Sequence, residues 1–468
     1  MIQASEQEKS LKKSILIIAA FAAFLSSFLF SAIVLALPAM GEEFNANAIE
    51  MGWILNSFSL SSGVFLLVFG RLGDIAGRKR IFSFGILFLT LSTFFIVFSP
   101  NILIVIILRI IQGLSNAMIF GTIMAIVSAA FKPGERGRAV GLNLTSTYLG
   151  LSLGPLLGGF LILYLGWRSI FIFIVPFNIV TLILIKLKIK IEWADSSGER
   201  FDLKGSIIYC FALFGFMYGF SILPSLIGWI CLAMGLLFGF IFMLIELKTE
   251  NPIFEFKLIF KNRMFAFSSL SSIIIYASIG TISFYTSLYL QYLKNLDAMT
   301  TGLIMISQPL GTAILSTLAG KLSDNGNPGI IASIGMGTVS IGLFLFYFIN
   351  ENTNIAYLIA LLGLIGLGFG LFSSPNTNAI MSSVEKKYLG IASGTLGTMR
   401  TIGQMLSMGI AMMLFSLYIG REIITPSIYP ALLIAIRTSF LIFAILCTLG
   451  IFVSLSRNKN FFKLFRLN

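Results

Sequence analysis

The chain has no histidine among its 468 residues and only three cysteines, Cys210, Cys231 and Cys447. Histidine is the commonest general acid or base in enzymes, and protein zinc sites are built mainly from histidine and cysteine. The cysteines lie far apart without ligand spacing and are expected to pack as small apolar side chains. We therefore expect no metal site, no bound cofactor and no enzymatic activity; an integral membrane transferase, which would need His/Asp pairs or acidic clusters, is disfavoured.

Charge is also scarce: 11% of the residues are charged and 57% are hydrophobic. Long runs of apolar residues without charge are typical of transmembrane helices. The sequence therefore predicts an all-α membrane protein. Fourteen spans are expected to begin near Ser14, Met51, Ile81, Ile102, Ala139, Trp167, Lys204, Ser225, Met264, Thr300, Gly329, Asn354, Tyr388 and Tyr429.

The net charge of +13 has an uneven distribution along the chain. With the N-terminus inside, most of the 32 Lys and Arg residues fall in cytoplasmic segments; the exceptions are Arg168, Lys294 and Arg421 outside, and Arg109, Arg400 and Arg437 within spans. This asymmetry predicts a multi-pass protein of the cell membrane with both termini cytoplasmic. The basic tail is interpreted as a topology anchor that also contacts anionic lipid, and a nucleic-acid partner is not expected.

Two halves of the chain resemble each other. The segment 70–74 (GRLGD) recurs as 320–324 (GKLSD), about 250 residues later. At one constant spacing, Gly113, Gly141 and Gly150 are matched by Gly366, Gly394 and Gly403. Repeated halves are typical of transporters in which two bundles move around a central site. We predict a six-helix bundle over 1–188, a polar linker with two inserted helices over 189–263, a second six-helix bundle over 264–456, and a basic tail over 457–468.

The strongest local pattern is a glycine-rich run in the fifth span, formed by Gly141, Gly150, Gly154, Pro155, Gly158 and Gly159. Glycines four residues apart share one helix face and allow another helix to approach closely. Proline removes a backbone donor and kinks the helix. This pattern indicates a helix that moves relative to its neighbours during function. The alternative is a tight, static helix pair. The run resembles the antiporter motif of the major facilitator superfamily, g-x8-G-x3-G-P-x2-G-G.

Residues 70–80 resemble the loop signature of the same superfamily, G-x-L-x-D-x-x-G-R-K/R. Here the glycines are expected to form a tight turn, and the cations to hold the loop at the cytoplasmic face. The family assigns this loop to stabilising one conformation. By that resemblance, the expected conformational latch consists of Gly70, Arg71, Asp74, Gly77, Arg78, Arg138 and Asp324. The alternative is a topology anchor.

Arg109, Gln112 and Gly113 form the pattern R-x-x-Q-G in the fourth span, which resembles another motif of the superfamily. An arginine inside a membrane span is costly and indicates a functional site. The resemblance implies a role in proton coupling, for which the candidates are Arg109, Gln112, Gly113, Asp74 and Arg400. Alternatively, Arg109 extends its side chain toward the outer interface.

Two further patterns resemble the fourteen-helix drug:proton antiporter branch. Trp53 to Leu60 follows W-x4-Y-x-L, with Phe58 in place of tyrosine. The first span ends in Ala-Leu-Pro as in D-x-T-x-x-N-x-A-L-P, but Leu29, Ser31 and Val34 replace the three polar residues. No Asp or Glu lies well inside a span. Proton coupling therefore either uses Asp74 or is weak or absent. The cavity should favour neutral lipophilic or anionic compounds, although aromatic rings also bind cations.

Polar and aromatic residues on the helices that line the family's central cavity are the substrate candidates. They are Ser27, Phe30, Ser31, Asn116, Phe120, Tyr276, Phe284, Tyr285, Tyr289, Gln308, Asn376 and Asn378. Pro375 is expected to break its helix and expose carbonyl groups to a ligand. Each candidate taken alone is more typical of an ordinary contact between helices than of a ligand contact.

The combined patterns predict a secondary active transporter of the major facilitator superfamily. We expect multidrug-type efflux of small lipophilic compounds by alternating access, coupled to protons, from a protein that functions as a monomer in the lipid bilayer. The alternative is a transporter of an anionic or neutral metabolite, favoured by Arg109 and Arg400. An ATP-driven pump is not expected, because the sequence has no G-x4-G-K-S/T phosphate loop.

Overall fold

The structure is a computed structural model that describes residues 2–131, 133–194, 196, 198–199, 201–249, 254, 256–384, 389–420 and 422–457. Within these ranges it leaves undescribed the side chains of residues 2–9, 133–134, 136–138, 144, 257–258, 260, 324–325, 389–391 and 393. The secondary structure of the described part is helical throughout, without strands.

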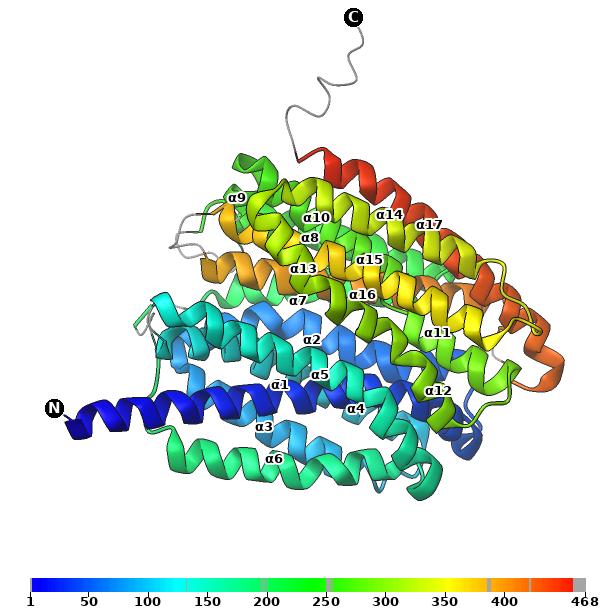
Figure 1. Cartoon of the computed structure of the whole chain (residues 1–468), viewed down its shortest axis with the longest axis horizontal. Helices are drawn as coiled ribbons and strands as arrows, with labels where there is room; N and C mark the ends of the chain where they lie inside the picture. Colours follow the sequence, from blue (N-terminus) through cyan, green and yellow to red (C-terminus); the bar gives the residue numbers. More distant parts are fainter. Residues whose placement is uncertain are drawn as a thin grey trace, which may run out of the picture. The chain divides into compact units, whose positions relative to one another are not determined.

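The helices of the N-terminal part are α1 (Ile2–Phe44), α2 (Ala48–Ala76), α3 (Arg78–Ile96), α4 (Ile102–Ala130), α5 (Pro133–Leu165), α6 (Arg168–Lys188), α7 (Leu203–Ser221) and α8 (Leu226–Glu246). Those that follow are α9 (Phe256–Lys261), α10 (Arg263–Ile279), α11 (Ile282–Leu288), the π-helix η1 (Tyr289–Leu293), α12 (Ala298–Met305), α13 (Ser307–Asn325), α14 (Pro328–Phe346), α15 (Ile355–Ser382), α16 (Leu389–Tyr418), the 3₁₀-helix η3 (Pro426–Ile428) and α17 (Tyr429–Leu455) (Figure 1).

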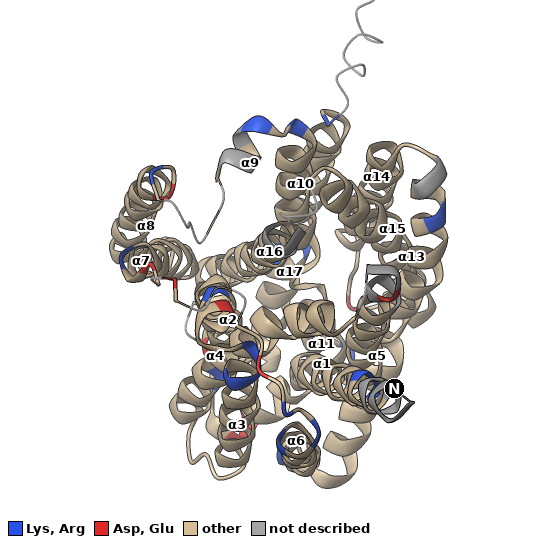
Figure 2. Ribbon diagram, turned by 90° about the vertical axis from the view of Figure 1, so that its left-hand side faces the viewer, with Lys and Arg blue, Asp and Glu red and all other residues tan. Residues whose placement is uncertain are grey.

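Fourteen helical segments of the described chain are long and apolar enough to cross a membrane, which confirms the predicted number of spans. The ninth segment joins α10, α11 and η1, and the tenth joins α12 and α13. Charged residues are confined largely to helix ends and connections, so most of the ribbon in Figure 2 is neutral. Asparagine caps start several helices; Asn101, for example, accepts the N–H of Ile104 at the start of α4.

The first compact unit consists of residues 1–46, 53–210 and 297–302. In it α1 packs along α5 and α6, and α3 packs along α4 and α6. Helices α2 and α4 approach closely through glycine: a Cβ at Gly113 would lie 2.2 Å from the carbonyl oxygen of Phe58. Without a hydrophobic driving force between helices in lipid, such close backbone packing is a main source of helix association.

The second compact unit consists of residues 47–52, 211–296 and 303–468. Here α15 packs against α13 and α14, α14 packs against α17, and α10 packs against α16 and α17. The pair α7 and α8 also meets through glycine, since a Cβ at Gly235 would lie 2.1 Å from the backbone nitrogen of Phe216. Apolar side chains such as Leu226 and Ile227 are exposed on α8, as expected for a helix that faces lipid.

Two local expectations are wrong. The glycines of residues 70–80 do not form one tight turn, because residues 70–76 belong to α2 and only Gly77 lies in a turn. The physical reason is packing: this part of α2 lies against α4, where a Cβ at Gly121 would lie 3.0 Å from the backbone nitrogen of Gly70 and from the carbonyl oxygen of Leu66. Helix α15 also continues through Pro375 without a break.

The predicted boundaries at residues 188, 263 and 456 stay a prediction. The compact units follow them only roughly, because residues 297–302, which belong to the predicted second bundle, lie in the first unit.

Candidate functional site

The connection between α2 and α3 carries a compact ion pair. Gly77 forms the turn with a φ of +110°, a backbone conformation that residues with a side chain rarely adopt. Asp74 lies in the last turn of α2, and Arg78 begins α3. Both Nε of Arg78 and its terminal nitrogen lie 2.7 Å from Oδ1 of Asp74. The Arg78 side chain is 11% exposed and the Asp74 side chain 31% exposed, so water screens the pair only in part.

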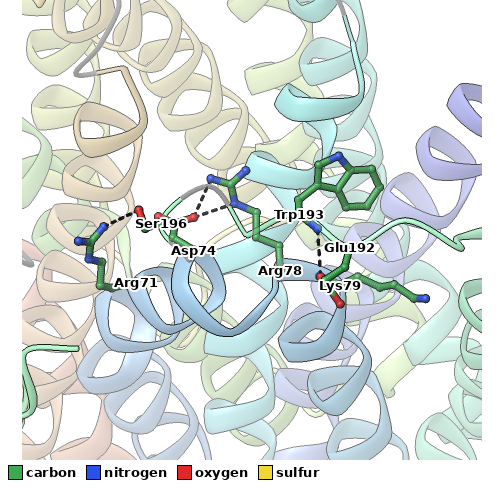
Figure 3. A network of polar contacts seen from close by, with 7 residues as sticks. All are labelled: Arg71, Asp74, Arg78, Lys79, Glu192, Trp193 and Ser196. Atoms are coloured by element: carbon green, nitrogen blue, oxygen red, sulfur yellow. Dashed lines mark hydrogen bonds and ion pairs between the residues drawn. The ribbon is translucent and has the colours of Figure 1, made fainter. Parts of the chain in front are cut away.

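The polar linker after α6 docks onto this connection (Figure 3). Trp193 accepts the Arg78 N–H at its carbonyl oxygen, at 2.9 Å. The Glu192 carboxylate accepts the Lys79 N–H at 2.8 Å. Ser196 donates its N–H to the carbonyl oxygen of Asp74 at 3.0 Å. We call Glu192, Trp193, Ser196 and Glu199 the docked linker.

Arg71 adds side-chain contacts to the docked linker. Its guanidinium donates to Oγ of Ser196 at 3.2 Å and to the carboxylate of Glu199. A Cβ at Gly77 would lie 2.6 Å from Cδ of Glu192, so a side chain at this position would also displace the Glu192 carboxylate. The structure thus joins Arg71, Asp74, Gly77 and Arg78 of the predicted latch within one unit.

The docked linker was missed by the sequence analysis, which treated the linker only as a polar connection. The signal available in the sequence was charge complementarity. Glu192 and Glu199 are acidic, and the segment 71–80, much earlier in the chain, is rich in arginine and lysine. Two predicted latch residues, Arg138 and Asp324, have side chains outside the described part of the structure.

We expect Glu192→Ala to release the docked linker locally while α2 and α3 stay folded. Losing the acceptor for the Lys79 N–H should speed deuterium exchange at Lys79 and Ser196 about tenfold, as expected for one hydrogen bond to a charged group. The measurement is hydrogen–deuterium exchange of the purified protein. Lys190→Ala, at an exposed position two residues earlier, is the matched control. Unchanged exchange in Glu192→Ala would show that the docking is not maintained by this carboxylate.

Arg109 is completely buried between α4 and α2. Its Nε donates to the carbonyl oxygen of Ile54 at 2.9 Å, and Nη1 donates to Oε1 of Gln112 at 2.8 Å. The guanidinium carbon lies 4.3 Å from the centre of the Phe58 ring. The side chain therefore turns into the helix bundle and does not extend toward the outer interface.

Gln112 and Gly113 support the same arrangement. Gln112 donates to Oγ1 of Thr93 on α3 at 3.0 Å, which fixes the orientation of the amide whose oxygen accepts the hydrogen bond from Arg109. The lack of a side chain at Gly113 allows α2 to approach. The three residues of R-x-x-Q-G thus form one buried polar junction of α2, α3 and α4.

Arg400 has a comparable aromatic neighbour in the second unit. Its guanidinium carbon lies 5.0 Å from the centre of the Tyr276 ring on α10. Gly403, one turn later on α16, faces the backbone of α10, where a Cβ would lie 2.5 Å from the carbonyl oxygen of Ile273. In each unit, an arginine therefore lies beside an aromatic ring and close to a glycine at which two helix backbones approach each other.

The glycines of α5 define a contact face with α1. A Cβ at Gly150 would lie 2.4 Å from the Phe24 carbonyl oxygen, and one at Gly158 would lie 2.7 Å from Cβ of Ala32. Between them, Gly154 faces Ser31, whose hydroxyl also donates to the Gly150 carbonyl at 3.4 Å. A Cβ at Gly141 would have no atom of the described residues within 4 Å, so this glycine makes no such contact with them.

A second face of α5 contacts the start of α12. A Cβ at Gly159 would lie 2.4 Å from the carbonyl oxygen of Ala298, and one at Gly302 would lie 2.1 Å from that of Pro155. Helix α5 is therefore in close backbone contact on two sides, with α1 and with residues 298–302.

Several substrate candidates serve as contacts between helices in this structure. Tyr285 is fully buried and shares a hydrogen bond with Ser439, beside Phe284. Asn116 donates to Ser62, Asn376 to Ser272, Asn378 to Ser323, and Tyr289 to the carbonyl of Asn350. Phe30 packs on Phe58 at 5.7 Å between ring centres. Ser27 and Tyr276 are buried, and Phe120 and Gln308 are partly buried.

Comparison with known proteins gives consistent matches. The family model described as "Major Facilitator Superfamily" matches residues 19–408. The riboflavin transporter RibZ of Clostridioides difficile (strain 630) is 29% identical over 450 residues, covering 94% of this chain and 96% of that protein. The multidrug resistance protein Stp of Mycobacterium tuberculosis (strain H37Rv) is 28% identical over 382 residues, covering 80% of this chain and 70% of Stp.

Among solved structures, a bacterial homolog of the human lysosomal transporter Spinster has the same fold. Its TM-score is 0.70 at 13% identity, and the match covers 98% of both chains. It confirms the predicted fold class.

Proposed function

Because the chain belongs to the major facilitator superfamily, and is therefore a membrane transporter and not an enzyme, we propose that it exports small lipophilic compounds by alternating access as a secondary active transporter coupled to protons. We further propose that it works as a monomer in the cytoplasmic membrane with both termini inside. The similarity to Stp, a multidrug resistance protein, supports the efflux assignment.

The observation that carries this proposal is the two-sided backbone contact of α5. Glycine allows two helix backbones to approach closely, because no side chain stands between them. In the proposed cycle, Pro155 and Gly159 separate from residues 298–302 and rejoin them, while the glycine face on α1 holds α5 in its bundle.

The substrate class follows from the charges. Arg109 is a buried cation, and the acidic residues of the described spans lie near helix ends, as Asp74 and Glu246 do. A permanently cationic compound would lose hydration inside these spans without gaining a carboxylate partner. Neutral lipophilic compounds avoid that cost.

A second candidate function is transport of a neutral or anionic metabolite. It is favoured by the similarity to a riboflavin transporter over nearly the whole chain. It is also consistent with the buried charge of Arg109, because a cation within the spans attracts an anionic compound.

Proteoliposomes containing the purified protein test both candidates. Uptake and efflux are measured with and without a pH gradient for a cationic dye, a neutral lipophilic dye, riboflavin and an anionic dye. We expect the neutral lipophilic dye to move at least about tenfold faster than in protein-free liposomes, and only with the gradient. Transport of riboflavin alone would favour the metabolite function, and transport restricted to the cation would contradict the proposed substrate class.

A further inference from the structure

Arg457 is a buried cation at one end of the second unit. It follows the last turn of α17, beside the first residues of α14. The residue is only 4% exposed. None of its three guanidinium nitrogens has a hydrogen-bond partner among the described residues. Burial lowers the pKa of Arg457 to about 9, so the side chain remains a cation at neutral pH.

Such an arrangement is unusual in a folded protein. Buried polar groups nearly always have a partner, and a buried charge without one is strongly destabilising. A guanidinium offers five N–H donors in a planar fork that matches carboxylate and phosphate groups. The side chain therefore has the capacity to bind an anion from outside the polypeptide.

The surroundings of Arg457 suit an anion. It lines a small cavity of about 10 Å³ together with Asn327, Gly329 and Ser454. Asn327 and Pro328 begin α14, so the positive end of the helix dipole points to this cavity. Gly329 leaves space there, because it carries no side chain toward Cδ of Arg457.

The neighbouring charges are also favourable. Arg263 donates its Nε to the carbonyl oxygen of Ser456 at 2.9 Å, which places a second guanidinium beside the cavity. In the sequence, Lys459, Lys463 and Arg466 follow within ten residues. The predicted topology assigns this end of the unit to the cytoplasmic side, where the membrane surface is anionic.

We propose that Arg457 and the start of α14 form a binding site for a phosphate group, contributed by an anionic phospholipid or by free phosphate. A cavity of about 10 Å³ holds roughly one oxygen atom. One oxygen of the group enters between Arg457 and Gly329, and the remainder stays outside, as it would for a group attached to a larger molecule. This site is built from residues of the second unit alone, and its assignment does not depend on the substrate.

The test is thermal unfolding of the full-length protein in detergent. The unfolding temperature is followed during titration with phosphatidylglycerol, with phosphatidylcholine, and with inorganic phosphate against chloride at equal ionic strength. Phosphatidylglycerol should stabilise the wild type, and Arg457→Gln should raise the half-saturating lipid concentration about tenfold or more, as expected for loss of charge-assisted hydrogen bonds. Lys321→Gln, which removes an exposed cation from the end of α13, should leave it unchanged.

The arms of the experiment separate the outcomes. Stabilisation by phosphatidylglycerol alone identifies a lipid headgroup, and stabilisation by inorganic phosphate identifies a free-phosphate site. Equal effects of phosphatidylcholine and phosphatidylglycerol with none from phosphate, or an unchanged titration in Arg457→Gln, would overturn the proposal. Without ligand, Arg457→Gln should unfold no earlier than the wild type, because a buried unpaired charge has been removed. Arg457→Lys, which keeps the charge but not the fork, provides an intermediate case if the glutamine variant does not fold.

Discussion

Gly150→Leu is expected to reduce transport at least about tenfold while the protein still inserts into the membrane. Even a Cβ at this position would lie 2.4 Å from the backbone oxygen of Phe24, so a leucine must push α5 away from α1. Overpacking of this kind typically costs about 1–3 kcal/mol, and it also moves Pro155 and Gly159 relative to residues 298–302. The measurement is transport in proteoliposomes together with the yield and unfolding temperature of the purified variant.

A matched control separates this contact from a general effect of leucine in a membrane helix. Gly363 lies in α15, and in the described part of the chain no atom would lie within 4 Å of a Cβ at this position. Gly363→Leu should therefore transport normally, and Gly150→Ala should give an intermediate loss. Normal transport by Gly150→Leu would show that the close approach of α1 and α5 is not needed for the transport cycle.

Arg109→Met is expected to lose most of the transport activity with little loss of stability. Methionine fills similar space and removes the buried charge, while the Ile54 carbonyl and Gln112 each lose a donor. These effects oppose each other, so we expect the free energy of unfolding to change by less than about 2 kcal/mol. Transport should fall at least about tenfold, because an intramembrane cation of this kind is retained for function.

Arg437→Met is the control for Arg109→Met. Arg437 makes the same kinds of contact in α17: its Nε donates to the Tyr347 carbonyl at 2.7 Å, and its guanidinium carbon lies 5.1 Å from the Tyr347 ring. It is only partly buried, however, and belongs to none of the proposed transport elements. Transport should persist in this variant. If Arg109→Met transports at the wild-type rate, Arg109 only holds α2 to α4.

The number of spans could be predicted from the sequence, because each span depends only on the composition of its own residues. About twenty apolar residues without charge can satisfy their backbone in a membrane only as a helix. The roles of the polar substrate candidates could not be predicted in the same way. Asn376 and Tyr285 have the composition of ligand-binding residues, yet their hydrogen bonds to Ser272 and Ser439 join helices that are distant in sequence.

The glycines show the same limit. The sequence places glycine at positions 70, 77 and 154 but does not say what each glycine allows. Tertiary structure assigns Gly77 to a turn, Gly70 to contact with α4, and Gly154 to contact with α1. A glycine can serve a positive φ or a close approach, and only the neighbouring helix distinguishes the two.

Sequence by itself therefore determined the helical spans, the charge asymmetry and the superfamily, since these depend on local composition and short motifs. Only the tertiary structure decided that the linker docks on the α2–α3 connection, that Arg109 turns toward Ile54, and that Arg457 lacks a partner among the described residues. Each of these depends on which side chains meet across distant segments, and pairing between segments is set by packing of the whole unit.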